Sequence, residues 1–209
     1  KMLSCQTPIT GLRLMESTGL LNLFIPELME CRGIGQGSYH HFDVLDHSFL
    51  VCNACPAGME HIHIRLAGLF HDIGKPAARK EAADGSCTFY RHEAISEKMT
   101  RSIMRRLKYS NAEIEKTAHL VAEHMFHYDP SWTDAAVRRF IVRVGKENID
   151  DLFALRKADV FGLTGTYAEP NFLVEFTARI DTLLKEDGAY SLKDLAVNGK
   201  DLMAIGIPA

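Results

Sequence analysis

The residue pair best suited to chemistry is His71-Asp72, which ends an apolar stretch and precedes Gly74 and Lys75. An aspartate at the end of a buried helix is costly to desolvate unless a partner compensates its charge. A bound cation removes that cost and uses the carboxylate as a ligand. Taken alone, the pair fits equally well a capping or salt-bridged aspartate beside an incidental histidine, because short motifs also arise by chance.

Four further side chains of metal-binding type lie in other predicted helices. They are His47, His92, His124 and Asp159. Histidines and carboxylates on separate helices of a bundle can converge on a buried ion. A mixed set of imidazoles and carboxylates suits Mn²⁺, Fe, Ni²⁺, Zn²⁺ or Co²⁺, and Mg²⁺ less well. The sequence therefore predicts one or two divalent metal ions inside a helical bundle.

The composition is that of an ordinary globular chain of 209 residues, with 46% hydrophobic and 24% charged residues. The formal net charge of -3 argues against a protein that coats nucleic acid through bulk positive charge. No apolar run reaches the ~20 residues that a membrane-spanning helix needs. Five cysteines, an odd number without a framework spacing, favour a reducing compartment, and we expect a cytoplasmic protein.

The elements that must position these side chains are helices. Apolar residues recur at helical spacing without sustained period-two alternation, so we predict an all-α bundle with a short helical N-terminal lead-in. The long helices are expected over residues 43–55, 61–73, 93–107, 111–126, 133–144, 149–161 and 169–184. Ser110, with Glu113 three residues on, is expected to form a capping box, and Thr133 to cap another helix. Residues 76–90 form a polar connection with room for a small hairpin.

The ordered set His47, His71-Asp72 and Asp159 resembles the H…HD…D pattern of the HD-domain superfamily of metal-dependent phosphohydrolases. The run from His71 to Pro76 is a specific match to the form that this pattern takes. The resemblance implies an HD-domain helical bundle. It also implies hydrolysis of a phosphomonoester or phosphodiester, with a nucleotide or an RNA end as the expected substrate.

The flanking motifs are similar to the C-terminal body of bacterial tRNA nucleotidyltransferases, the CCA-adding and poly(A) polymerase family. These motifs are Gly19-Leu20-Leu21, Ile25-Pro26-Glu27-Leu28, residues 41–47, Arg91-His92-Glu93 and residues 194–202. The resemblance implies a lead-in over 1–36 like the end of a neck region, an HD domain over 37–187 and a truncated extension over 188–209. It also implies a longer parent protein that acts on tRNA. We expect this chain not to add nucleotides by itself, because the Gly-Ser loop and paired aspartates of a polymerase head are not found in it.

The resemblance assigns ligand roles residue by residue. The implied ligands of a first metal ion are His47, His71, Asp72 and Asp159, and those of a second are His92 and His124. Some binuclear relatives have two adjacent histidines at the position of His124, where this chain has Met125 in second place. His127, three residues after His124, is a candidate substitute on the same helix face.

The implied mechanism also assigns roles to residues around the metal ions. A divalent ion lowers the pKa of bound water, and Asp72 would bridge the ions or orient the nucleophile. Lys75 and Arg91 are expected to contact phosphate oxygens. His41 and His127 are further candidates for contacts with the substrate, although a helix-capping or solvent-facing role explains His41 more simply.

Two other functions fit the sequence. One is a catalytically silent tRNA-binding or structural module, for which the basic run at residues 101–108 is a candidate RNA contact. A solvated helix face explains that run more simply. The other is a phosphodiesterase of cyclic dinucleotides, which ranks last because no Gly-Tyr-Pro segment follows His124.

Overall fold

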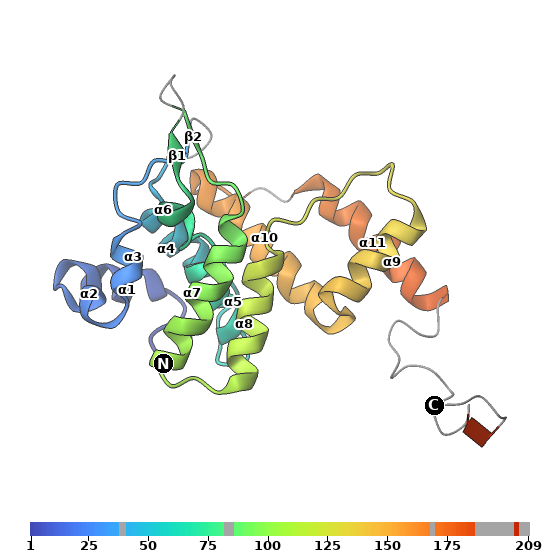
Figure 1. Cartoon of the computed structure of the whole chain (residues 1–209), viewed down its shortest axis with the longest axis horizontal. Coiled ribbons are helices and arrows are strands. Elements are labelled where there is room, and N and C mark those ends of the chain that lie inside the picture. Colours follow the sequence, from blue (N-terminus) through green and yellow to red (C-terminus); the bar gives the residue numbers. More distant parts are fainter. Residues whose placement is uncertain (38–40, 82–85, 168–169, 187–202, 205–209) are drawn as a thin grey trace. The chain divides into compact units, whose positions relative to one another are not determined.

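The backbone divides into two compact units. The computed structural model describes residues 1–37, 41–81, 86–167, 170–186 and 203–204. The first unit contains Lys1–His127 and Asp150–Pro170, and the second contains Tyr128–Ile149 and Asn171–Ala209. Figure 1 labels the helices and strands of both units.

Three short helices begin the first unit: α1 (Pro8–Ser17), α2 (Leu20–Phe24) and α3 (Pro26–Met29). A proline begins α1 and α3, where its missing N–H costs no hydrogen bond. Gly19 makes the turn between α1 and α2 with a φ of +78°, a conformation that favours glycine. α1 packs against α4 (Val44–Ala54), so these helices form a lead-in attached to the bundle.

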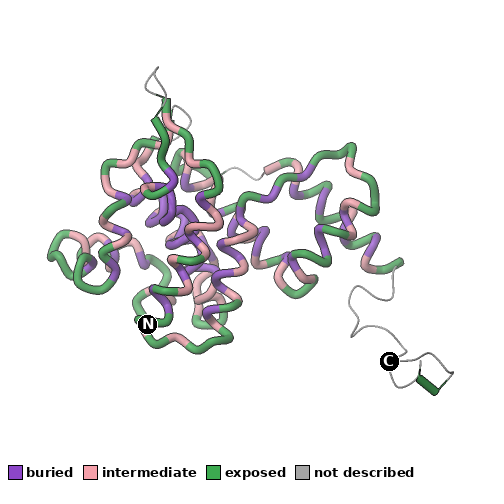
Figure 2. The backbone as a smooth tube through the Cα atoms, viewed as in Figure 1, coloured by how far each residue is buried: buried purple, intermediate pink, exposed green. Residues whose placement is uncertain are grey.

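The centre of the first unit is α5 (Ile62–Phe70). It packs against α4 and α8 (Asn111–Glu123), and α8 packs in turn against α7 (His92–Arg106). α10 (Ile149–Thr164) belongs to the same unit. Every residue from 64 to 75 is buried, as the purple stretch of the tube in Figure 2 illustrates. Burial of this apolar helix on all sides is a major source of stability for the unit.

The polar connection after α5, which the sequence left with room for a small hairpin, contains a short helix and two short strands. α6 (Lys75–Ala78) packs against α7, and β1 (Lys80–Glu81) follows it. β1 pairs antiparallel with β2 (Cys87–Thr88). The strands lead the chain back to the start of α7, which lies beside the end of α5.

The second unit contains α9 (Asp134–Val144), a 3₁₀ turn (Lys146–Asn148) and α11 (Asn171–Glu186). Its core is aromatic, because the rings of Tyr128 and Phe176 stack with centroids 4.2 Å apart. α9 and α11 pack against each other within this unit.

The predicted all-α class is confirmed, and so are its capping residues. The Ser110 hydroxyl accepts a hydrogen bond from the Glu113 N–H at 3.3 Å, and the Glu113 carboxylate accepts one from the Ser110 N–H at 2.9 Å. Thr133 caps α9 by accepting from the N–H of Ala136. The predicted helix over 111–126 ends earlier, at Glu123, and the Phe126 N–H donates to the Glu123 carbonyl three residues before it, which departs from the α-helical hydrogen-bond pattern.

The domain boundaries predicted after residues 36 and 187 stay predictions. The predicted extension over 188–209 lies outside the described residues except for residues 203–204. None of the described helices combines the length and the apolar character needed to cross a membrane.

Candidate metal centre

The six predicted metal ligands come together where helices of the first unit meet. They are His47 in α4, His71 and Asp72 at the end of α5, His92 at the start of α7, His124 at the end of α8 and Asp159 in α10. Their ligand atoms form two groups of three, each within 4.8 Å of one another. The C-terminal ends of α5 and α8 have partial negative charge, which favours a cation beside them.

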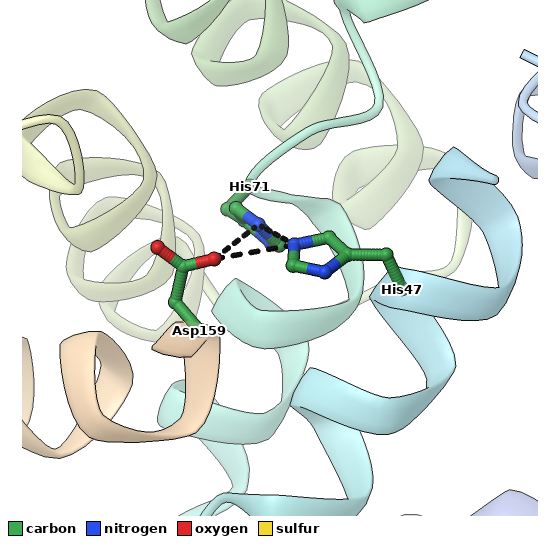
Figure 3. A group of neighbouring side chains, drawn as sticks. All are labelled: His47, His71 and Asp159. Carbon is green, nitrogen blue, oxygen red and sulfur yellow. Dashed lines mark hydrogen bonds and ion pairs between the residues drawn. The ribbon is translucent and has the colours of Figure 1, made fainter. Parts of the chain in front are cut away.

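The first group consists of His47, His71 and Asp159, which point toward one another from three helices (Figure 3). Nε2 of His47 lies 3.1 Å from Nε2 of His71. Oδ1 of Asp159 lies 3.2 Å from Nε2 of His47 and 3.5 Å from Nε2 of His71. Two imidazole nitrogens and one carboxylate oxygen, all buried or half-buried, therefore face one point, as the ligand atoms of a metal ion do.

The second group consists of Asp72, His92 and His124, and all three are buried. Nε2 of His92 lies 3.0 Å from Oδ1 of Asp72 and 3.2 Å from Nε2 of His124. Nε2 of His124 lies 3.8 Å from the same carboxylate oxygen.

Asp72 connects the two groups through its two oxygens. Oδ1 faces the second group, whereas Oδ2 lies 3.2 Å from Nε2 of His71 and 3.5 Å from Nε2 of His47. A carboxylate in this position can bridge two cations, one in each group. The side chain is only 3% exposed, so its charge requires compensation by the groups around it.

Backbone carbonyls orient three of the four imidazoles. Nδ1 of His71 lies 2.9 Å from the Gly68 carbonyl oxygen, and Nδ1 of His124 lies 2.7 Å from that of Val121. His92 makes the same contact to the carbonyl three residues before it. A carbonyl only accepts, so Nδ1 bears a proton in each ring, and Nε2 is the nitrogen left to bind a metal ion once it is unprotonated. Donor types and ring orientation therefore both fit divalent metal ions.

Gly74 allows α7 to approach the end of α5 closely enough to place His92. The Gly74 N–H donates to the hydroxyl of Ser96 at 2.9 Å. A Cβ at this position would lie 2.7 Å from the Ser96 nitrogen and 2.8 Å from the His92 carbonyl oxygen. Any larger residue would push α7 and its ligand outward, which explains the glycine after His71-Asp72.

Burial and neighbouring charges set the protonation states of the residues in both groups. Burial opposes the charged form of His71, but the charges of Asp72 and Asp159 outweigh it and raise the His71 pKa to about 10. Burial disfavours both carboxylates, yet the facing histidines hold the pKa values of Asp72 and Asp159 well below their usual range. Burial and the His71 charge lower the pKa of His124 to about 3, so His124 is neutral and able to act as a ligand.

A cavity of about 770 Å³ opens over both groups, and its lining includes the predicted residues Lys75 and Arg91. Nζ of Lys75 donates to Oδ2 of Asp72 at 2.7 Å and to Oε1 of Gln36 at 2.5 Å. Arg91 is exposed and has a φ of +60°, an uncommon conformation for a residue other than glycine. The positively charged side chains of Lys75 and Arg91 therefore border the space above the candidate metal ligands.

Two predicted substrate contacts are not brought to the cavity. His41 is exposed and uses its backbone N–H to donate to the Leu163 carbonyl, and the side chain of Asp43 caps α4 instead. His127 is exposed as well. The expectation that His127 shares a helix face with His124 is wrong, because α8 ends at Glu123.

Two residues of the site were not foreseen from the sequence. Gln36 accepts from Lys75 but lies in a loop, where no periodicity points to a role. Arg156 donates to Oδ2 of Asp159 at 3.1 Å from one turn earlier in α10. The i, i+3 spacing of these opposite charges was a signal that sequence reasoning could have used.

Gly162→Ala is expected to weaken the first group of ligands. In a helix interior this change normally stabilises by about 1 kcal/mol. Here a Cβ would lie 2.5 Å from Cγ2 of Val51 and 2.8 Å from Nδ1 of His47. We therefore expect a loss of about 1–3 kcal/mol in the free energy of unfolding, as for overpacked cores, together with weaker binding of Mn²⁺.

Urea denaturation and calorimetric titration with Mn²⁺ measure both effects. Gly35→Ala is the control, because a Cβ there has open space around it. A Gly162→Ala chain that is more stable than the wild type, with unchanged Mn²⁺ affinity, would contradict the packing argument.

Comparison with known proteins finds matches over most of this chain. The family model described as the HD domain matches residues 39–162, which is more than half of the chain. The A-adding tRNA nucleotidyltransferase of Deinococcus radiodurans is 35% identical over 162 residues, covering 71% of this chain and 34% of that protein. The CC-adding tRNA nucleotidyltransferase of Thermus thermophilus is 32% identical over 181 residues, covering 84% of this chain and 40% of that protein.

A shorter match, 32% identity over 106 residues, covers 24% of a protein of Azoarcus sp. described as a multifunctional CCA protein. The chain therefore spans well under half the length of these curated relatives. The matched range of the family model contains all six residues of the two groups. The chain belongs to the HD domain family.

Proposed function

We propose that this domain is a divalent-metal-dependent phosphohydrolase that cleaves a phosphomonoester or phosphodiester of a nucleotide or RNA end. The observation that supports the proposal is the position of Asp72, whose two oxygens each face a different group of donor atoms. The ligands are His47, His71, Asp72 and Asp159 for one ion, and Asp72, His92 and His124 for the other. The mixed donor set suits Mn²⁺, Fe, Co²⁺, Ni²⁺ or Zn²⁺ better than Mg²⁺.

When bound, two such ions acidify water and neutralise charge on a phosphoester. The residues of the chain supply the arrangement around them. Asp72 keeps the two groups at a fixed separation and compensates positive charge between them. Lys75 and Arg91 border the cavity, and we propose that they bind phosphate oxygens of the substrate. The N-terminal end of α7, which begins at His92, adds partial positive charge on the same side.

The cavity volume of about 770 Å³ lies within the range of small-molecule sites, about 300–1,000 Å³. Phe89 and Tyr90 add aromatic surface to its lining. We propose a nucleotide-sized substrate on this basis. The names of the relatives support a parent protein that acts on tRNA, of which this chain is the HD part.

The basic run at residues 101–108 supports the alternative tRNA-binding role less well. Arg101 pairs with Glu97 and Glu115, and Arg106 pairs with Glu27. These carboxylates already compensate the positive charges of Arg101 and Arg106, with which an RNA phosphate would otherwise pair.

Elemental analysis of the purified chain and a phosphoester assay test the proposal. We expect up to two divalent ions per chain, and Mn²⁺-dependent or Co²⁺-dependent hydrolysis of bis(p-nitrophenyl) phosphate or nucleoside 2′,3′-cyclic phosphates. Tight tRNA binding in a salt series, with no hydrolysis under any divalent ion, would favour the silent module instead. Selective cleavage of cyclic dinucleotides would favour the signalling phosphodiesterase.

The metal affinity of the chain is expected to rise with pH between about 6 and 9. Near pH 7 the imidazole of His71, with a pKa of about 10 before a metal ion binds, holds a proton that the ion must displace. Asp72, Asp159 and His124 release none in this range, because their pKa values lie far below it. One released proton makes the dissociation constant fall about tenfold for each pH unit.

Calorimetric titration with Mn²⁺ in buffers of different ionisation enthalpy counts the released protons. A count of about one at pH 7 is expected. A dissociation constant that does not change between these pH values would contradict the displacement of a proton from His71.

A further inference from the structure

Arg156 contacts Asp159 of the first group and the backbone carbonyl of Phe126, two residues after His124 of the second group, although it is not itself a metal ligand. Nη1 donates to Oδ2 of Asp159 at 3.1 Å, the carboxylate oxygen other than the one facing His47 and His71. Nη2 donates to the carbonyl oxygen of Phe126 at 2.6 Å. One planar guanidinium therefore joins α10 to the segment that leaves α8.

The Phe126 end of this link is firmly packed. The guanidinium of Arg156 lies over the Phe126 ring, 4.9 Å from its centroid. On α10 the Phe153 ring stacks on Phe126 with centroids 5.6 Å apart and planes at 24°. Phe126 is two residues beyond His124, so its position controls where the end of α8 presents that ligand.

The contact also decides how Asp159 meets an ion. A carboxylate with a free second oxygen can rotate and bind through either oxygen or both. The bond from Arg156 occupies Oδ2 and leaves Oδ1 3.2 Å from Nε2 of His47. Hydrogen bonds of this kind to the outer atoms of metal ligands typically change metal affinity by about 10–100-fold when removed.

We propose that Arg156 is a positioning residue that holds Asp159 in the first group and fixes the distance of that group from His124 in the second. The inference rests on the proposed function, because it assumes that both groups bind ions. Lysine cannot replace arginine in this role, since an ammonium lacks the planar pair of donors that reaches both acceptors.

The test compares Arg156→Gln and Arg156→Lys with the wild type by calorimetric titration with Mn²⁺ and by electron paramagnetic resonance. Two Mn²⁺ ions that share the Asp72 carboxylate give an exchange-coupled spectrum, which isolated ions do not. Lys157→Gln, which removes one positive charge from an exposed position of the same helix, is the matched control. Thermal unfolding without metal measures any purely structural effect.

We expect both Arg156 variants to bind the first ion about 10–100-fold more weakly and to lose the coupled spectrum, while Lys157→Gln behaves as the wild type. A folded Arg156→Lys chain with wild-type affinity and an unchanged spectrum would overturn the inference. Failure of both Arg156 variants to fold would also overturn it, by assigning Arg156 a structural role. If the wild type binds no divalent ion, the proposed function fails first, so the two failures are distinguishable.

Discussion

Replacing Asp72 by alanine is expected to abolish hydrolysis and remove both metal ions. The two oxygens of this carboxylate face different sets of ligand atoms, so its loss weakens two ion sites at once. Metal ions typically contribute several kcal/mol to transition-state stabilisation, and about 4 kcal/mol corresponds to a rate loss of about a thousandfold. Elemental analysis and kcat/KM for bis(p-nitrophenyl) phosphate measure the two effects.

Asp72→Asn separates the loss of the carboxylate charge from a folding defect, because asparagine keeps the volume of the side chain while removing its charge. Asp151→Ala is the matched control from α10, where Asp151 pairs with His63 and Lys116 away from the two ligand groups. We expect Asp72→Asn to fold but to bind little Mn²⁺, and Asp151→Ala to keep both ions. Equal metal content and turnover in the wild type and Asp72→Asn would refute the site.

Replacing Arg65 by methionine is expected to cause the largest loss of stability. The residue is 1% exposed in α5, and its guanidinium donates to backbone carbonyls. Its acceptors include the carbonyl oxygens of Pro56 at 2.8 Å and Leu3 at 2.5 Å, with those of Cys5 and Cys55. Methionine fills the volume but leaves these carbonyls without their donor, so we expect a loss of about 3–5 kcal/mol.

Urea denaturation monitored by circular dichroism measures this loss, and Arg105→Met, at an exposed position of α7, is the control. Because Arg65 joins the N-terminal segment to α5, we also expect faster proteolysis before α1. An Arg65→Met chain as stable as the wild type would mean that water satisfies the released carbonyls.

The sequence by itself was sufficient to predict most of the helices and the identity of the ligand residues. The periodicity of apolar residues placed α4, α5, α7 and α8, because each helix buries one face or all of its surface in a repeating pattern. Helix capping at Ser110 and Thr133 depends on residues only three positions apart, so it could also be predicted from the sequence. Histidine and aspartate types in a recognisable order identified the candidate ligands.

The tertiary structure alone decided how those ligands divide and which residues support them. Asp72 faces both groups because of the turn after α5 and the close approach of α7 at Gly74. Neither feature follows from the spacing of residues along the sequence. The positions of Gln36 and Arg156 beside Lys75 and Asp159 depend likewise on contacts between helices. Sequence patterns report local preference, whereas a site shared by distant helices is set by packing, in which contacts between residues far apart in the chain determine distance and orientation.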